Sequence, residues 1–289
     1  MGEPAMIRVT AILLASLALA CGQSVEFTGN VYLQGGMDIG GTGGGGGGAA
    51  AWSPTNIANL LIWHKADSGV YDYTPVTPPG TDNAPVSKWD DLSGNAIHLY
   101  NETGSGGSPK WVTNAWNGKP VVRFTAASSH YLTNSFSNLS GTDLPATFAF
   151  VFSVAATNTT ATLFRNFKKD DSDNIWVSYL TTAGKYANWR KDDSGGNTEV
   201  SQGPTFAGTN LCVMFISSGT VMSIYTNNVL CVSAAQNVAA CIFNCGYVGK
   251  SGANYMNGDI GEIVIYGAAL SDADRTNLFN YFDDRWAIQ

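Results

Sequence analysis

The carboxylate side chains of the sequence could in principle cleave a glycosidic bond. That reaction needs two carboxylates on one face of a protein, about 5 to 9 Å apart. The glutamates of the chain are Glu3, Glu26, Glu102, Glu199 and Glu262. The nearest approach to a catalytic pair is Asp259 with Glu262, but an odd spacing on a strand points two side chains to opposite faces. A glycoside hydrolase would therefore need carboxylates from separate strands to converge.

Nucleophilic catalysis has no support in the sequence. The three histidines are His64, His98 and His130, and none accompanies a Gly-x-Ser-x-Gly nucleophile motif. Neither a metal-binding histidine pair nor a dinucleotide-binding glycine fingerprint occurs. We therefore predict a protein without enzymatic activity.

Acidic residues gather in two short segments, 168–174 (KKDDSDN) and 191–197 (KDDSGGN). Three strand-like runs, 162–167, 175–180 and 186–190, alternate with them and form an up-down-up meander if short turns join them. The first and third strands then run the same way, so both segments leave the same end of the sheet. The carboxylates expected to meet there are Asp170, Asp171, Asp173, Asp192 and Asp193.

Two tryptophans complete this candidate site. If Thr182 and Ala183 are the central residues of the intervening turn, Trp176 pairs with Trp189 on one face, just below the acidic segments. Such a pair can stack on a sugar ring, and carboxylate and amide oxygens are the ligands that calcium prefers. The predicted ligand-binding residues are Trp176, Trp189, Asp171, Asp173, Asn174, Asp192 and Asp193. A Ca²⁺ ion, which the protein does not require, would bind Asp171, Asp173 and Asp193; the alternative is solvated hairpin tips over two packing tryptophans.

An all-β scaffold has to position these residues. The 33 glycines and the low share of charged residues, 13%, fit short strands joined by tight turns. The runs 147–152 (TFAFVF) and 211–216 (LCVMFI) are apolar on both faces, which predicts central, buried strands. About ten strand-like runs at regular spacing predict a two-sheet antiparallel jelly-roll sandwich over residues 52–289.

Charge and cysteine content narrow the list of partners. The net charge is -7 with only 15 Lys and Arg, so binding to a nucleic-acid backbone lacks its electrostatic driving force. Cys212, Cys231, Cys241 and Cys245 form no Cys-x-x-Cys pattern, which disfavours a zinc site. In an exported chain they could pair as disulfides, and they fit equally well as buried core residues.

The first 51 residues divide into three segments. Residues 1–20 carry Arg8 before an apolar run that is too short to span a bilayer and ends in Ala-Leu-Ala, which predicts a signal peptide, with an uncleaved hydrophobic arm as the alternative. Cys21 follows at once and resembles the lipidated residue of bacterial lipoproteins, so any membrane anchoring is expected there. Residues 21–37 form a short N-terminal segment. Residues 38–51 form a glycine-rich linker, because a run of consecutive glycines holds no regular structure.

The last stretch, 257–289, predicts a strand, a turn and a helix. Ile260 and residues 263–266 (IVIY) form a β-branched and aromatic run of strand length. Ser271 followed by Asp274 indicates a helix start, and Leu278, Phe282 and Trp286 recur at helical spacing. We expect a helix from Ser271 to Arg285 that packs one apolar stripe on the sandwich.

This C-terminus resembles that of concanavalin A-like lectin and glucanase domains, the laminin G-like group. The stretches 61–67 (LIWHKAD), 86–94 (VSKWDDLSG) and 117–124 (NGKPVVRF) carry the same resemblance. It implies the sandwich fold, which hosts lectins, glycosidases and structural modules alike. The glucanases of this group carry Glu-x-Asp-x-Glu on one strand, a motif that this chain lacks.

We therefore expect a non-catalytic carbohydrate-binding or adhesion module that is exported and exposed on a cell surface, with a glycan or cell-surface polysaccharide as partner. The 8 Trp and 12 Tyr supply flat rings for sugar recognition. The alternative is a structural protein of a bacteriophage virion, in a tail or capsid appendage, that self-associates or assembles into the particle. A glycoside hydrolase is the minor alternative.

Overall fold

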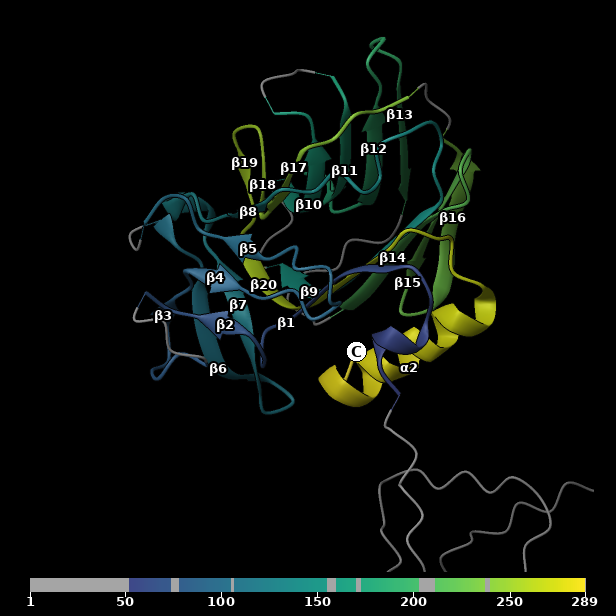
Figure 1. Ribbon diagram of the computed structural model, residues 1–289. Helices are drawn as coiled ribbons and strands as arrows, with labels where there is room; N and C mark the ends of the chain where they lie inside the picture. Colours follow the sequence, from purple (N-terminus) through teal and green to yellow (C-terminus); the bar gives the residue numbers. More distant parts are fainter. Residues whose placement is uncertain are drawn as a thin grey trace, which may run out of the picture. The chain divides into compact units, whose positions relative to one another are not determined.

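Two antiparallel sheets stack face to face in the computed structural model of the chain, and one helix lies on the outside of the first sheet (Figure 1). The structure describes residues 52–73, 78–104, 107–154, 160–169, 173–202, 211–236 and 240–288. They belong to one unit, residues 51–289. The predicted β-sandwich with a C-terminal helix is confirmed. The predicted segments 1–20, 21–37 and 38–51, with Cys21, lie outside the described residues.

The first sheet has nine strands. In spatial order they are β16 (Val229–Ala235), β15 (Val221–Thr226), β14 (Leu211–Ser217), β9 (Ala146–Val154), β20 (Gly258–Tyr266), β7 (Lys119–Phe124), β6 (Lys110–Trp116) and β3 (Ala84–Pro85), with β1 (Leu60–Lys65) paired to β20. Residues 147–152 of β9 and every residue of β14 are buried, which confirms the prediction that these two runs form central strands.

The second sheet also has nine strands. Their order is β13 (Asn197–Gln202), β12 (Tyr186–Lys191), β11 (Ile175–Leu180), β10 (Ala161–Phe167), β17 (Cys245–Val248), β8 (Leu132–Asn134), β5 (Leu99–Tyr100), β4 (Lys88–Trp89) and β2 (Val70–Tyr71). The short elements that remain are the hairpin β18 (Lys250–Ser251) and β19 (Asn254–Tyr255) and the 3₁₀ helices η1 (Pro54–Asn56) and η3 (Ala126–Ser128).

Aromatic rings from the facing strands hold the two sheets together. Phe148 of β9 packs edge-on against Trp176 of β11 with 4.9 Å between ring centroids, and it also contacts Phe164 of β10. All three side chains are almost completely buried. Burial of such rings removes a large apolar area from water, so this contact is a main source of the stability of the sandwich.

Strand β20 changes neighbours halfway along its length. Its first residues pair with β7 and its last residues pair with β1, while β9 follows it on the other side. The register with β9 shifts between Ile260 and Glu262, which places a bulge at Gly261. A Cβ atom at this position would lie 3.1 Å from both the Trp116 and the Trp286 rings. Glycine is needed here because two indoles cover the backbone.

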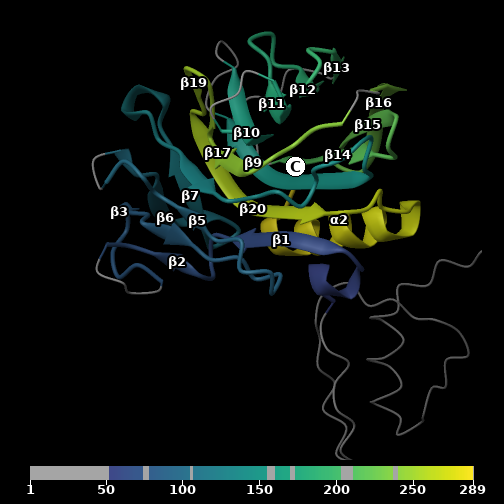
Figure 2. The same ribbon diagram turned by 45° about the horizontal axis from the view of Figure 1, so that its top comes forward.

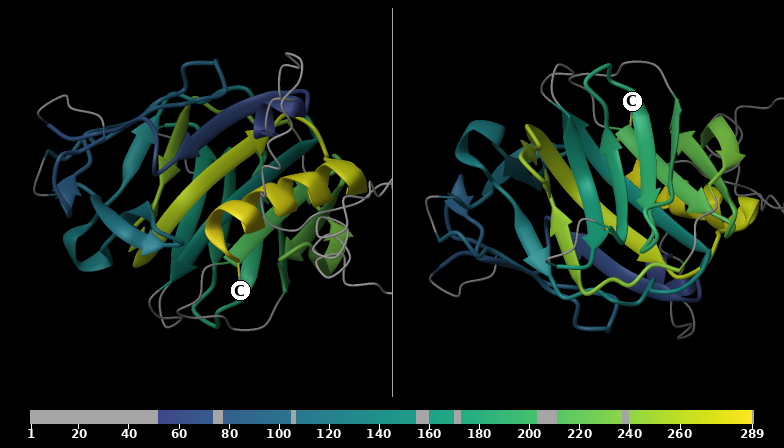
Figure 3. Two further views of the ribbon diagram at one scale, coloured as in Figure 1. Left: turned by 90° about the horizontal axis from the view of Figure 1, so that it is seen from below. Right: turned by 90° about the horizontal axis from the view of Figure 1, so that it is seen from above.

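Helix α2 (Asp272–Trp286) follows the prediction closely. The Ser271 hydroxyl accepts a hydrogen bond from the Asp274 N–H at 3.1 Å and so caps the first turn. The helix lies along the first sheet (Figures 2 and 3). Its Leu278, Phe282 and Trp286 side chains are completely buried. Within the described part of the chain, no helix combines the length and the apolar character needed to cross a membrane.

The turn at residues 90–97 and the cysteines have structural roles. The Asp91 carboxylate accepts hydrogen bonds from the backbone N–H groups of Trp63, Ser93 and Ile97, at 2.9 to 3.0 Å. It therefore fixes the turn. Cys212, Cys231, Cys241 and Cys245 are free thiols. Burial raises the pKa of the Cys212 thiol, as expected for a core residue.

A buried histidine makes the fold sensitive to acid. His64 is 1% exposed, its Nδ1 donates to the Asp90 carbonyl at 2.8 Å, and burial lowers its pKa to about 4. Below the ordinary histidine pKa of about 6.5, the unfolded chain takes up a proton that the folded chain does not accept until about pH 4. Stability present at neutral pH is therefore lost as the pH falls through this window.

We expect the free energy of unfolding to fall by about 2 to 3 kcal/mol more in wild type than in His64→Gln between about pH 7.5 and pH 4.5. Glutamine keeps a hydrogen-bond donor at this position but does not titrate. Urea unfolding followed by tryptophan fluorescence measures both proteins at both pH values. An equal decline in both would show that His64 does not cause the acid sensitivity.

Candidate functional site

The predicted pair of Trp176 and Trp189 is wrong. The register between β11 and β12 pairs Trp176 with Arg190 and pairs Val177 with Trp189. The turn is one residue longer than predicted, because Thr181 donates its N–H to the carbonyl of Lys185 instead of pairing with Gly184. A shift of one residue moves a side chain to the other face of a sheet, so the two indoles lie on opposite faces.

Trp176 is a core residue. It is 1% exposed, and its Nε1 donates to Asn188 Oδ1 at 2.7 Å. The Arg190 guanidinium lies over its ring, 4.5 Å from the centroid. Trp189 packs on the outer face beside Val177. The two tryptophans therefore cannot stack on one sugar.

The two acidic segments do meet, as predicted. Asn174 donates from Nδ2 to Asp193 Oδ1 at 2.7 Å, and Asp173 forms an ion pair with Lys191. Asp192 accepts hydrogen bonds from the N–H groups of Ser194 and Gly196, both at 2.9 Å, and so stabilises its own turn. These contacts already engage one carboxylate oxygen of Asp192 and one of Asp193. Asp171 lies outside the described residues, and the calcium site stays a prediction.

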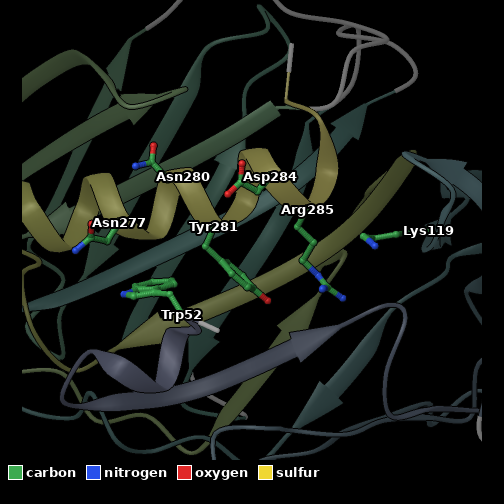
Figure 4. Close-up of a pocket in the computed structure, with 7 residues that line it drawn as sticks. All are labelled: Trp52, Lys119, Asn277, Asn280, Tyr281, Asp284 and Arg285. Atoms are coloured by element: carbon green, nitrogen blue, oxygen red, sulfur yellow. The ribbon is translucent and has the colours of Figure 1, made fainter. Parts of the chain in front are cut away.

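A pocket of about 550 Å³ lies where helix α2, Trp52 ahead of η1 and Lys119 at the start of β7 come together (Figure 4). Its lining residues are Trp52, Lys119, Asn277, Asn280, Tyr281, Asp284 and Arg285. Tyr281 and Arg285 project from α2 towards the strands below, and Trp52 lies beside Tyr281 with 5.6 Å between the ring centroids. The pocket thus combines aromatic, amide, carboxylate and cationic groups.

Five of these residues come from one face of α2. Asn277, Asn280, Tyr281, Asp284 and Arg285 follow the spacing i, i+3, i+4, i+7 and i+8, which forms a stripe along a helix. The stripe is offset by one residue from the apolar stripe that packs on the sheet. Its spacing was visible in the sequence, but a polar stripe on a helix normally indicates a solvated face. Only the approach of Trp52 and Lys119 turns it into a pocket.

A buried carboxylate, Glu262, lies beneath the pocket and holds two of its lining residues in place. Glu262 is completely buried and accepts three hydrogen bonds, from Trp63 Nε1 at 2.6 Å, Tyr281 Oη at 2.8 Å and Trp286 Nε1 at 2.7 Å. Arg285 lies 3.3 Å away through its Nε and also forms an ion pair with Asp67. Tyr281 and Arg285 are therefore fixed from below while they line the pocket from above.

Burial outweighs the hydrogen bonds in setting the pKa of Glu262. Burial raises the pKa of Glu262, whereas the hydrogen bonds from Trp63, Trp286 and Tyr281 and the nearby Arg285 act in the opposite direction. Burial also raises the pKa of Tyr281, so the phenol keeps its proton as a donor. Asp259 is bound elsewhere, by two hydrogen bonds from Arg123 at 2.7 and 2.8 Å. These two carboxylates have separate partners and do not act as a pair.

Four side chains that line the pocket have no polar partner among the described residues. The side chains of Lys119, Asn277, Asn280 and Asp284 form no hydrogen bond or ion pair with any residue that the structure describes. They can therefore bind hydroxyl and carboxylate groups without first breaking an internal contact. A ring face beside free amide and carboxylate groups is the composition of a sugar site.

Comparison with known proteins shows the fold. No family model matches the chain, and no curated protein matches its sequence. Among solved structures, the binding domain of Paraclostridial Mosquitocidal Protein 1 has a TM-score of 0.55 and 16% identity over 80% of this chain and 53% of that chain. The binding domain of Botulinum Neurotoxin DC in complex with SialylT has a TM-score of 0.55 and 11% identity over 79% and 52%.

A further match is the ligand binding domain of Botulinum neurotoxin serotype D in complex with N-acetylneuraminic acid, with a TM-score of 0.54 and 10% identity over 77% of this chain and 51% of that chain. At such identities the likeness shows the β-sandwich fold alone. The chain spans about half the length of these domains.

We expect Glu262→Gln to lower the free energy of unfolding by about 3 to 5 kcal/mol. The substitution removes the negative charge that pairs with Arg285. It also places an amide NH₂ group, which can only donate, among side chains that are themselves donors. The exposed Glu199, bound by Tyr179 through one hydrogen bond, offers the control Glu199→Gln. Urea unfolding of both variants gives the comparison. Equal stability of the two variants would show that the buried cluster does not hold α2 in place.

Proposed function

We propose that the chain is a non-catalytic carbohydrate-binding module and that the pocket beside α2 holds the sugar. One observation carries the proposal: Trp52 and Tyr281 stand next to unengaged polar side chains over a base that Glu262 fixes. A preorganised ring and free hydrogen-bonding groups lower the cost of ordering the site on binding. The single free carboxylate of the wall, Asp284, suits binding better than two-carboxylate hydrolysis.

One free cation of the pocket offers a partner for an acidic sugar, while Asp284 supplies one negative charge on the same wall. Arg285 is already paired with Asp67 and Glu262, so Lys119 is the cation left for a ligand carboxylate among the residues that line the pocket. The Trp52 ring would pack on the apolar face of a pyranose, and Asn277, Asn280 and Asp284 would bind hydroxyl groups. The solved neighbours with SialylT and N-acetylneuraminic acid support this direction, since the latter carries a carboxylate.

The biological setting belongs to the same proposal. We infer a concanavalin A-like arrangement of the sandwich, which the C-terminal strand, turn and helix support. The module would be exported through residues 1–20 and exposed on a cell surface, where a glycan or polysaccharide is its partner. Lipidation of Cys21 would anchor it to a membrane.

A structural role in a virion is the second candidate, and an exposed edge strand favours it. Strand β16 lies at the end of the first sheet, and its Val229 and Leu230 are 67% and 51% exposed. An apolar edge strand with unpaired backbone groups is a template for pairing with another chain. Self-association through β16 would assemble such modules into a larger particle.

We expect Trp52→Ala to weaken binding of 3′-sialyllactose by about tenfold or more, which corresponds to about 1.4 kcal/mol, because the ring face of the pocket is lost. Lys119→Ala should remove the preference for sialyllactose over lactose. Isothermal titration calorimetry on the full chain measures both. Tyr73→Ala, which removes a 42% exposed ring elsewhere on the domain, is the control. Binding by Trp52→Ala at wild-type strength would contradict the proposed pocket.

For the second candidate, we expect the wild-type chain to form oligomers that Leu230→Lys dissociates, since a charge on the edge strand blocks pairing between strands. Light scattering coupled to size-exclusion chromatography gives both masses. Ser233→Lys is not a suitable control, because it lies on the same strand. A monomeric wild type at high concentration would contradict assembly through β16.

A further inference from the structure

The outer face of the second sheet carries apolar side chains. Phe164 of β10 and Trp176 of β11 point inward, because both rings contact Phe148 of the first sheet. Their sequence neighbours Arg165 and Val177 therefore point outward. The residues of the apolar cluster on this outer face are Phe167, Ile175, Val177 and Cys245, with Tyr179, Trp189 and Tyr247 packed against them. Helix α2 lies on the other sheet (Figures 1 and 3). An antiparallel sheet that meets water on one side usually alternates apolar with polar residues, so an apolar outer face indicates a contact surface.

One register row crosses this face over six neighbouring strands. From β12 to β5, the paired residues are Trp189, Val177, Arg165, Tyr247, Thr133 and Tyr100. Residues in register share a face, and neighbouring strands lie about 4.8 Å apart, so this outer row is roughly 24 Å long. It places one indole and two phenol rings along a line, with a guanidinium between them. Tyr100 is 47% exposed, and Trp189 and Tyr247 are partly exposed.

Arg165, in the middle of the outer row, has no acidic partner. Its guanidinium lies over the Phe167 ring, 4.1 Å from the centroid. Its Nε is buried and finds no hydrogen-bond acceptor among the described residues. Burial also lowers the pKa of Arg165, although the side chain stays charged. A desolvated charge without a counter-ion is costly, so this position favours an anion from outside the chain.

A second cation joins Arg165 through aromatic contacts. Lys250, at the start of the β18–β19 hairpin, holds its Nζ 4.1 Å from the centroid of Tyr131 and 5.2 Å from that of Tyr247. It forms no ion pair or hydrogen bond with any residue that the structure describes. Tyr247 packs in turn on Phe167, with 4.6 Å between the ring centroids. The two cations therefore lie on one continuous aromatic surface.

The carboxylates that accompany the outer row lie at its ends. Glu199 pairs with Trp189 on the edge strand β13 and accepts a hydrogen bond from the Tyr179 hydroxyl. It is three strands away from Arg165, which is roughly 14 Å. Glu102 follows β5 at the opposite end and is exposed. The middle of the row is thus positively charged, although the whole chain carries a net charge of -7.

We propose that this face binds a linear polysaccharide whose units carry anionic groups. The Arg165 guanidinium donates two parallel hydrogen bonds to a carboxylate or sulfate, and Lys250 neutralises a second anionic group. Trp189, Tyr247 and Tyr100 pack on the apolar faces of successive sugar rings. The inference rests on the proposed carbohydrate-binding function, but the outer row shares no residue with the pocket beside α2, so the two can fail separately.

The variant Arg165→Gln separates binding from folding. It removes a desolvated charge that has no counter-ion, so the melting temperature should stay unchanged or rise. Arg165→Lys keeps the charge but loses the planar fork and should bind with intermediate strength. Lys185→Gln is the matched control, because it removes one positive charge from the exposed turn between β11 and β12, away from the row.

The experiment is biolayer interferometry of the full chain on immobilised polygalacturonate and dextran sulfate. Methyl-esterified polygalacturonate and dextran are the uncharged counterparts. Wild type should bind at least one charged polymer at least about tenfold more tightly than its uncharged counterpart, and the polymer preferred identifies the anion as carboxylate or sulfate. Arg165→Gln should lose about tenfold or more in affinity, whereas Lys185→Gln and Trp52→Ala should bind as wild type does.

Four results would overturn the inference: no binding to either charged polymer, equal binding to charged and uncharged forms, Arg165→Gln at wild-type strength, or an equal loss in Lys185→Gln. A single-stranded oligothymidylate bound as tightly as the polysaccharides would also overturn it, because the face would then recognise charge alone. Loss of 3′-sialyllactose binding in Trp52→Ala with polymer binding retained would support two separate sites.

Discussion

The buried carboxylate of Glu262 is the constraint on which the arrangement of α2 depends. An ionised group without water is costly, and here four partner side chains from two separate parts of the chain surround it. Trp63 comes from β1, while Tyr281, Arg285 and Trp286 come from the helix. Since the carboxylate needs all of them, the helix cannot slide or rotate on the sheet without leaving a charge unpaired. The pocket inherits this rigidity, because two of the donors also form its wall.

Much of the architecture follows from patterns in the sequence. The aromatic and β-branched runs of β9, β14 and β20 predict buried central strands, and the Ser271 cap with the stripe through Trp286 predicts the helix. Strand β13 (Asn197–Gln202) was missed, because it lies at the edge of its sheet and its residues are mostly polar. Edge strands need little apolar surface, so periodicity does not reveal them.

The sites were harder to predict, for two physical reasons. Register depends on turn length, and one extra residue in the turn before β12 was enough to separate Trp176 from Trp189. The pocket beside α2 depends on a contact between Trp52 and Tyr281, which lie at opposite ends of the domain sequence. Sequence spacing describes one element at a time, whereas the pocket beside α2 forms between elements.

The position of β1 beside β20 also has a consequence for synthesis of the chain. Trp63 and Glu262 are separated by 199 residues, so β1 has no strand partner until almost the whole domain has left the ribosome. Contacts of such long range slow folding. Strand β1 is synthesised early and stays exposed until β20 has been synthesised. Chaperones that hold nascent or exported chains would therefore bind this segment first. They would no longer be needed once β1 has paired with β20 and α2 has packed against both.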